Sequence, residues 1–324
     1  MKKNLVLILT LLLSLSLFAE ENIAAENYVL KNYKFNESWG YVIQGHEKDL
    51  HENMMITDLS YFSADIDCYG RIPYIPKRDD IKNYKGRVHL VITCNSYSLS
   101  HFVLDPKYGV RNGIIKTIVE ASKDYDGIQI DFETVPKEDN ENFYQFLKIL
   151  KKKLKGKTFS VCVPARLKTL ENDIFDYQKM CTVADKVFVM AYDQHWSTSR
   201  PGPIAGMSWC EQICDYALTV IPKEKLVMGL PFYGRSWQNE SYGKAWLYSG
   251  VERILKENKV SYSQIKREDE VPYVKFNTNV KVTMWFDDAQ SLASRCKMYE
   301  NKGVENVGFW RIGQEDQKFW EAFE

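Results

Sequence analysis

The stretch DGIQIDFETV (residues 126–135) has the pattern of a buried β-strand that carries unusually many polar residues. Three apolar residues alternate in it with three polar ones, which are Gln129, Asp131 and Glu133. Side chains alternate between the two faces of a strand, so these three polar groups share one face. Burying such groups without partners costs roughly 2–7 kcal/mol each. Their presence in a buried strand therefore indicates that they have hydrogen-bond partners or a function.

Strand-like segments of this kind recur along the chain and alternate with helical patterns. Apolar residues repeat at helical spacing in residues 114–119, 143–154, 209–220 and 292–299. Eight buried strands, most followed by a helix, predict one (β/α)8 TIM barrel in the α/β class. A doubly wound open sheet is the alternative, but no glycine-rich dinucleotide fingerprint follows the first strand. The predicted strands are residues 40–43, 58–62, 88–93, 127–132, 159–163, 186–192, 225–231 and 305–310.

A short insertion is predicted between the seventh and eighth strands, in residues 236–281. It holds one helical pattern at 250–257 and a β-ribbon pattern around 271–276. We expect so small an insertion to leave a shallow, open groove over the barrel.

The N-terminus has the pattern of a secretory signal. Lys2 and Lys3 precede an apolar run from Leu5 to Phe18, and Ala19 is followed by acidic residues. We predict a signal peptide over residues 1–19 and a single catalytic domain over 20–324, exported to the periplasm or secreted. Leu17 fits the cleavage pattern imperfectly, so a retained anchor is the alternative.

Composition narrows the classes of partner. The 43 basic residues balance the 43 acidic ones, which gives no indication of a nucleic-acid surface. The seven cysteines are scattered and odd in number, and the five histidines form no metal-binding pair. We read Cys94 and Cys162, inside apolar runs, as small buried hydrophobic residues. We expect no metal, no cofactor and a monomer.

Polar and aromatic residues gather at the predicted ends of three strands. Asp131 and Glu133 end the fourth strand, Tyr192 and Asp193 the sixth, and Trp310 the eighth. Catalytic groups of such barrels project from the C-terminal strand ends. Acids at these ends can also simply pair with Lys or Arg, but such pairing would seldom produce this combination. The pattern therefore favours an active site.

These residues are also where the chain resembles a known family. DGIQIDFE (126–133) is similar to the D-x-x-D-x-D-x-E signature of glycoside hydrolase family 18, the chitinase-like enzymes. Four further segments resemble the family in its order, from about Tyr41 to the C-terminus. The chain looks most like the bacterial branch of spore-cortex and other cell-wall lytic members. The four segments are YFSADID (61–67), MAYD (190–193), GLPFYGR (229–235) and GFWRIGQED (308–316).

The resemblance implies a role for each matching residue. Glu133 matches the general acid, and Asp131 matches the residue that orients and stabilises the acetamido group of the substrate. Tyr192 matches the phenol that hydrogen-bonds the acetamido carbonyl. Asp193 matches a sugar contact, and Trp310 matches the floor under the reacting ring. The implied substrate is an N-acetylglucosamine-containing polysaccharide, either peptidoglycan or chitin.

The spacing of the two acids agrees with that reaction. Two residues along a strand separate Asp131 and Glu133 by roughly 7 Å, a gap that an inverting pair also shows. Side chains from one strand approach from the same side, whereas two-carboxylate mechanisms need acids that flank the scissile bond. A 2-acetamido group on the substrate supplies the missing nucleophile, and a neighbouring Asp131 anion would raise the pKa of Glu133.

The chain departs from the family pattern at one signature position. The middle Asp of the signature is Gln129, whose amide cannot ionise but can donate a hydrogen bond to Asp131. A hydrolase with an altered pH profile is predicted, and a catalytically silent, lectin-like carbohydrate-binding protein is the alternative. Asp126 matches the first Asp of the signature and is expected deeper in the barrel in a structural role. Candidates to line the groove are Trp196, Tyr233, Arg235, Trp237 and Trp285.

Overall fold

The computed structural model describes residues 33–323, so the predicted signal segment lies outside the described residues. Eight parallel strands form a closed barrel in the order β1-β13-β7-β6-β5-β4-β3-β2. The last of them, β13, closes the ring by pairing with both β1 and β7. The TIM barrel prediction is confirmed. The strands are β1 Glu37–Ile43, β2 Asp58–Asp65, β3 Arg87–Thr93, β4 Gly127–Asp131, β5 Thr158–Pro164, β6 Lys186–Met190, β7 Leu226–Pro231 and β13 Asn306–Trp310.

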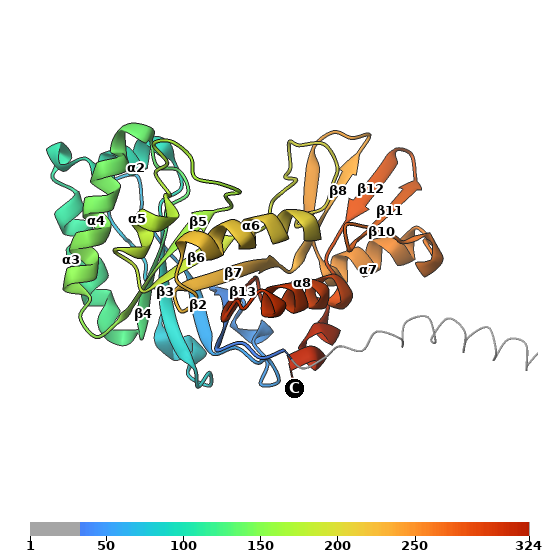
Figure 1. Ribbon diagram of the computed structural model, residues 1–324, viewed down its shortest axis with the longest axis horizontal. Coiled ribbons are helices and arrows are strands. Elements are labelled where there is room, and N and C mark those ends of the chain that lie inside the picture. The colour runs from blue at the N-terminus through green and yellow to red at the C-terminus, as the bar shows by residue number, and fades with distance from the viewer. Residues whose placement is uncertain (1–32, 324) are drawn as a thin grey trace, which may run out of the picture.

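Helices cover the outside of the barrel (Figure 1). The four helical patterns correspond to α3 Arg111–Ala121, α4 Asn140–Lys153, α6 Met207–Val220 and α8 Ala289–Asn301. The alternation is incomplete, because β1 and β2 are followed only by the 3-10 segments η1 Glu47–Asp49 and η2 Arg78–Ile81. No helix within residues 33–323 is long and apolar enough to cross a bilayer. The remaining segments of the barrel are α2 Tyr97–Leu104, η3 Pro106–Tyr108, η4 Ser122–Asp124, η5 Lys137–Asp139, α5 Tyr177–Cys181 and η7 Gln317–Phe323.

The two faces of each barrel strand pack in two separate cores. On the outer face of β4, Phe132 stacks on Phe143 and Phe146 of α4, with ring centroids 6.0 and 5.6 Å apart. The inner face contributes to a smaller core inside the ring, and polar groups such as Gln129 are buried there too. The alternation of the strands therefore directs polar groups into the barrel. The inner core consists of Trp39, Tyr41, Val91, Cys162, Phe188 and Val227.

The insertion after β7 contains more strands than predicted. The predicted helix and ribbon are present, but they belong to a five-stranded antiparallel sheet in the order β10-β11-β12-β8-β9. The prediction of one helix and a single β-ribbon in this insertion is therefore corrected to one helix and five strands. Its short strands escaped notice because charged residues and glycines interrupt their alternation. The elements are β8 Tyr233–Gln238, β9 Gly243–Leu247, α7 Tyr248–Glu257, η6 Tyr262–Gln264, β10 Lys266–Glu268, β11 Val271–Asn277 and β12 Lys281–Trp285.

The two faces of the inserted sheet have different partners. One face packs against α7, where Val251 and Leu255 contact Met284 and other apolar residues. On the other face, the register sets Trp285 opposite Arg235 on one side and opposite Tyr273 on the other. Figure 1 shows the insertion beside the barrel, with α6 and α8 near the boundary. The inserted sheet and α7 together are called the inserted wall below. Its face opposite α7 carries aromatic side chains.

A buried ion pair attaches this wall to the barrel. Arg295 of α8 and Asp287 are almost fully buried, and the Arg295 guanidinium bonds both Asp287 and the backbone oxygen of Ala205. Ala205 lies near the end of the loop between β6 and α6. From the insertion, the Asp269 carboxylate accepts hydrogen bonds from Ser208 N at 2.9 and 3.1 Å and so caps α6. Loop, helix and insertion are therefore held as one unit.

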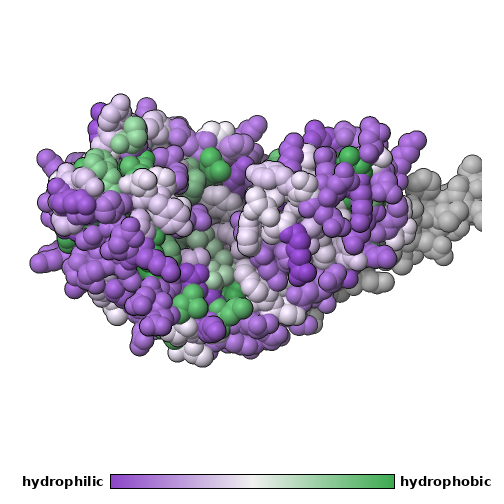
Figure 2. All heavy atoms as spheres, turned by 90° about the horizontal axis from the view of Figure 1, so that it is seen from above, coloured by the Kyte–Doolittle hydropathy of each residue, from purple (hydrophilic) through white to green (hydrophobic). Residues whose placement is uncertain are grey.

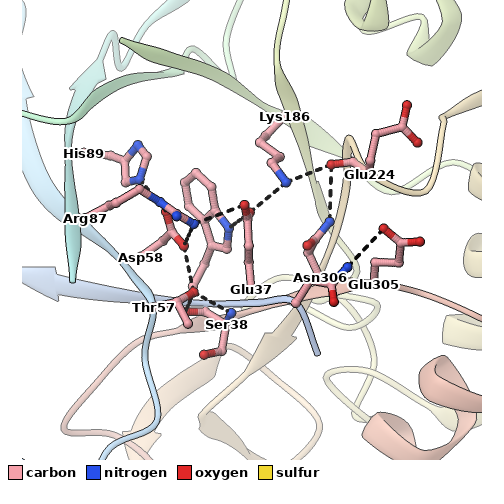
Figure 3. A network of polar contacts seen from close by, with 12 residues as sticks. Glu37, Ser38, Thr57, Asp58, Arg87, His89, Lys186, Glu224, Glu305 and Asn306 are labelled. Atoms are coloured by element: carbon pink, nitrogen blue, oxygen red, sulfur yellow. Dashed lines mark hydrogen bonds and ion pairs between the residues drawn. The ribbon is translucent and has the colours of Figure 1, made fainter. Parts of the chain in front are cut away.

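A second polar network closes the opposite end of the barrel, where the strands begin (Figure 3). The buried Asp58 carboxylate accepts hydrogen bonds from Arg87 at 2.7 and 2.6 Å and lies 2.8 Å from His89 Nε2. Burial alone would raise the pKa of Asp58, but the bonds from His89 and Arg87 outweigh it and lower the pKa. Glu37 bridges Arg87 and Lys186 at 3.1 and 2.8 Å. Features at this end of a TIM barrel serve stability.

Candidate active site

The polar residues of the fourth strand and of the segment just after it lie in a row that begins inside the barrel. The row ends at the barrel mouth, the open end where the strands finish. Gln129 is fully buried, and Asp131, the last residue of β4, is 7% exposed. Glu133 lies two residues beyond the end of the strand and is exposed. Burial therefore decreases along the chain from Gln129 to Glu133. A buried carboxyl thus stands directly beneath an accessible one.

Two of these side chains each have one buried atom without a hydrogen-bond partner. The Oε1 atom of Gln129 accepts a 2.6 Å bond from the Tyr41 hydroxyl, which leaves the Nε2 atom of Gln129 unpaired. The Oδ1 atom of Asp131 is also buried and unpaired. Buried unpaired polar atoms are rare in proteins and ask for an explanation. An amide N–H of a ligand bound at the mouth would satisfy the Asp131 oxygen.

The interior beneath the acids contains a thiol whose role the sequence did not reveal. Cys162 of β5 is buried as predicted, but its Sγ lies 3.4 Å from the Tyr41 hydroxyl rather than among apolar atoms alone. Its hydrogen bond to Asp131 lowers the pKa of that carboxyl against the larger opposing effects. Tyr41, Cys162 and Gln129 therefore form a polar floor under Asp131.

Burial and neighbouring charge raise the pKa of both carboxyls. Burial and then the negative charge of Glu133 raise the pKa of Asp131 to about 7. Loss of hydration and then the charge of Asp193 raise the pKa of Glu133. Burial, together with nearby acidic groups, also keeps the pKa of Tyr192 well above its usual value. Near neutral pH the pair can thus hold a proton, and the phenol of Tyr192 remains a hydrogen-bond donor.

The sixth strand ends two residues earlier than predicted, so Tyr192 and Asp193 lie on the loop that follows β6. Asp193 has a positive φ of 57°, a conformation that Asp tolerates better than most residues. Its Oδ1 atom accepts hydrogen bonds from the Tyr233 hydroxyl at 2.6 Å and from Arg235 at 3.0 Å. Two residues of the inserted wall therefore hold Asp193 at the mouth of the barrel.

Aromatic side chains from the barrel and the insertion meet at this mouth. Trp310, the last residue of β13, packs edge-on against Tyr41 and against Phe62, with centroids 5.2 and 4.9 Å apart. Tyr192 and Trp310 also pack against a cluster of the insertion that contains Tyr233, Trp237 and Trp285. The structure thus brings residues from the loop after β6, from β13 and from the insertion together. Viewed from above, the surface is hollowed between the barrel and the insertion (Figure 2).

The structure corrects the predicted places of Trp237 and Asp126, whereas Trp196 stays a candidate. Trp237 is fully buried, with its Nε1 donating to the Ser199 backbone, so it cannot line an open groove. Trp196 is half-exposed on the loop after β6 and donates to Thr198 of that loop. Asp126 is exposed at the beginning of β4 rather than deep in the barrel, and it accepts a 2.8 Å bond from the Val88 backbone.

Sequence reasoning missed the residues that surround the acids from other strands. Tyr41, Cys162, Phe62 and Met190 all pack in or against the inner core of the barrel. Alternation along each strand was the available signal, since Tyr41 and Cys162 occupy inward positions. Within residues 33–323 no group of three potential His, Cys, Asp or Glu ligands could hold a metal ion. The arrangement offers proton transfer and hydrogen bonding at one mouth.

Comparisons with known proteins agree with this geometry. The family model Glycosyl hydrolases family 18 matches residues 49–315. The chain is 26% identical to the uncharacterized glycosylase YvbX of Bacillus subtilis (strain 168) over 61% of this chain, but spans only 60% of that relative. It is 26% identical to the cortical fragment-lytic enzyme of Bacillus anthracis, over 83% of this chain and 67% of that protein.

A solved structure shows the same fold. The spore cortex-lytic enzyme SleL of Bacillus cereus superimposes with a TM-score of 0.77 at 24% identity, over 90% of this chain and 74% of that one. The family model covers most of the chain, including the strand that carries Asp131 and Glu133. The chain therefore belongs to glycoside hydrolase family 18.

Proposed function

We propose that the protein is a retaining, substrate-assisted hydrolase of β-1,4-linked glycans that contain N-acetylglucosamine. One observation carries the proposal. An accessible acid with a raised pKa, Glu133, stands beside a buried Asp131 whose oxygen lacks a partner. The mouth that they share is bordered by the phenol of Tyr192 and the indole of Trp310.

In the proposed mechanism, Glu133 donates its proton to the glycosidic oxygen as the bond to the anomeric carbon breaks. The acetamido oxygen of the substrate attacks that carbon and forms a cyclic oxazolinium ion. Asp131 accepts the acetamido N–H and stabilises the positive charge, while Tyr192 donates to the acetamido oxygen. Water then opens the ring and gives its proton to Glu133, so two inversions leave the β configuration.

Asp193 supports this mechanism over one with a second carboxylate as the nucleophile. Its Oδ1 atom already accepts bonds from Tyr233 and Arg235, which hold it to the inserted wall. The other neighbouring acid, Asp131, ends β4 only two residues before Glu133 and is buried. The acetamido group of the substrate is the remaining nucleophile.

The polymer proposed first is peptidoglycan, with chitin as the second candidate. Supporting peptidoglycan are the relatives named cortical fragment-lytic enzymes, to which the chain is similar. The predicted N-terminal signal would export the protein to the compartment where a cell wall is accessible. We further propose that the protein acts without a metal or cofactor and as a monomer.

The test is turnover of an aryl N,N′-diacetylchitobioside and of purified peptidoglycan by the wild-type protein. We expect aryl release, new reducing ends, and the β anomer as the first product in NMR spectra. The α anomer as first product would exclude the substrate-assisted mechanism. Oligosaccharide binding without turnover of either substrate would replace the hydrolase with the lectin-like alternative.

The pH dependence provides a separate prediction. Asp193 raises the pKa of Glu133 by like-charge repulsion, so Asp193→Asn should lower that pKa. Because Glu133 must be protonated to act, the alkaline limb of kcat/KM should move to lower pH in the variant. A pH–rate profile of the aryl glycoside measures this shift, whatever the variant does to the maximum rate. An unmoved or alkaline-shifted limb would contradict the assigned interaction.

A further inference from the structure

Asp131 has a neighbouring side chain on each of the two strands that flank β4. On β3, its register partner is Thr93. On β5, the register that pairs Ile130 with Val161 makes Cys162 the next partner, opposite Asp131. Adjacent strands lie about 4.8 Å apart, and paired residues point to the same face of the sheet. The carboxyl can therefore be reached by a hydrogen-bond donor from either side.

The hydroxyl groups around Asp131 already use their protons elsewhere. Thr93 donates to the carboxylate of Asp65, at the end of β2. The Tyr41 hydroxyl donates at 2.6 Å to the Oε1 atom of Gln129, whose own Nε2 atom is unpaired. Each hydroxyl has a single proton to donate. In this arrangement neither Thr93 nor Tyr41 has a proton left for Asp131.

The buried thiol of Cys162 has one proton and two acceptors beside it. Its Sγ lies 3.4 Å from the Tyr41 hydroxyl oxygen, which can accept the S–H because its own proton points to Gln129. The carboxyl of Asp131 is the other acceptor. Burial raises the pKa of the thiol well above its usual value, so the sulfur keeps its proton whichever acceptor it meets.

We propose that Cys162 is a positioning residue of the reaction, whose S–H turns from the Tyr41 oxygen to Asp131 when that carboxyl is ionised. This inference rests on the proposed function, in which Asp131 acts as an anion beneath the acetamido group. A hydrogen bond from β5 holds one carboxylate oxygen and leaves the other to accept the acetamido N–H. A carboxylate is the stronger acceptor, so the thiol proton follows the charge of Asp131.

The charges around Asp131 decide the direction of the expected pH effect. Burial raises the pKa values of the nearby phenols and of the thiol, so these groups stay neutral while Asp131 titrates. Glu133 changes charge together with Asp131. Loss of a donor to the ionised form raises the pKa of Asp131 further. The groups that surround Asp131 are Glu133 beyond β4, Cys162 on β5, Tyr41 on β1, Tyr192 after β6 and, through Thr93, Asp65 on β2.

The first test is the pH dependence of kcat/KM on the aryl N,N′-diacetylchitobioside, in variants of the full protein. Because Asp131 acts as an anion, Cys162→Ala should move the acid limb to higher pH by about half a unit and lower kcat/KM below that limb about threefold. Cys162→Ser supplies a hydroxyl donor and should return the limb to its wild-type position. Cys296→Ala removes a buried thiol of α8 and is the matched control, expected to leave the limb unmoved.

Infrared spectroscopy tests the hydrogen bond without catalysis. The S–H stretching band of Cys162 is obtained as the difference between the wild type and Cys162→Ala. We expect this band to move to lower wavenumber as the pH rises through the titration of Asp131, and to stay in place when Asp131→Asn provides the background. A band that ignores pH in the wild type, or an acid limb unmoved by Cys162→Ala, would overturn the inference. A moving band without aryl release by the wild type would refute the hydrolase and leave the hydrogen-bond switch standing.

Discussion

Glu133→Gln is expected to lower kcat on peptidoglycan or on a chito-oligosaccharide by about 10²–10⁴-fold, the usual contribution of a general acid. Glutamine keeps the size and much of the hydrogen bonding of the side chain but has no proton to transfer. Glu133 is exposed at the barrel mouth, so the exchange should leave stability nearly unchanged. Initial rates with matched thermal melts measure both effects.

The leaving group provides an internal check on this assignment. A dinitrophenolate departs without protonation, so the loss of kcat in Glu133→Gln should be much smaller on a dinitrophenyl glycoside than on the natural glycan. Glu257→Gln makes the same chemical change on the exposed face of α7 and should behave like the wild type. Activity of Glu133→Gln within a factor of three of the wild type on the natural glycan would remove Glu133 from its proposed role.

Arg295→Met is expected to reduce the free energy of unfolding by about 3–5 kcal/mol, and Tm by about 10 °C. The loss is expected to be this large because the variant leaves Asp287 buried without its cationic partner. Asp287 is fully buried, burial already raises its pKa, and Arg295 is the main opposing influence. Without Arg295 the carboxylate must either stay charged in the interior or take up a proton. The measurement is denaturant unfolding at several pH values.

The titration of Asp287 also decides how the stability loss in Arg295→Met depends on pH. Loss of Arg295 raises the folded pKa of Asp287 further above its unfolded value, so the stability deficit should grow as pH rises from about 4 through that folded pKa. Arg295→Met combined with Asp287→Leu removes both charges and should recover most of the loss. Equal deficits in the single and double variants, or a deficit independent of pH, would show that packing alone matters there.

The sequence was most informative where alternation was strict. The pattern of β4 predicted both the strand and the face that carries Gln129, Asp131 and Glu133, and the eight strands confirmed the barrel. The roles of these residues stay predictions, because geometry alone does not test catalysis. Contacts between different strands could not be predicted from local sequence patterns. The hydrogen bond between Tyr41 and Gln129, for example, joins residues that are 88 positions apart.

The insertion was underestimated for a physical reason. A strand such as Lys266–Glu268 is entirely exposed and carries no apolar pattern, because backbone pairing with β11 is what orders it. Trp237 likewise looked like a groove residue, since nothing in its neighbours along the chain shows that the insertion buries it. Cys162 was recognised as buried, but only the assembled barrel shows which polar groups it meets.

The closure of the barrel by β13 has a consequence for how the chain folds. Asn36 and Glu305, 269 residues apart, hydrogen-bond where β1 meets β13. Until the last strand is available, β1 and β7 are open sheet edges with unpaired backbone groups, which invite pairing with other chains. Contacts so distant along the chain form slowly, because their loops must close first. The finished ring has no edge, so the aggregation hazard that comes from β1 and β7 belongs to the synthesis of the chain and not to the closed barrel.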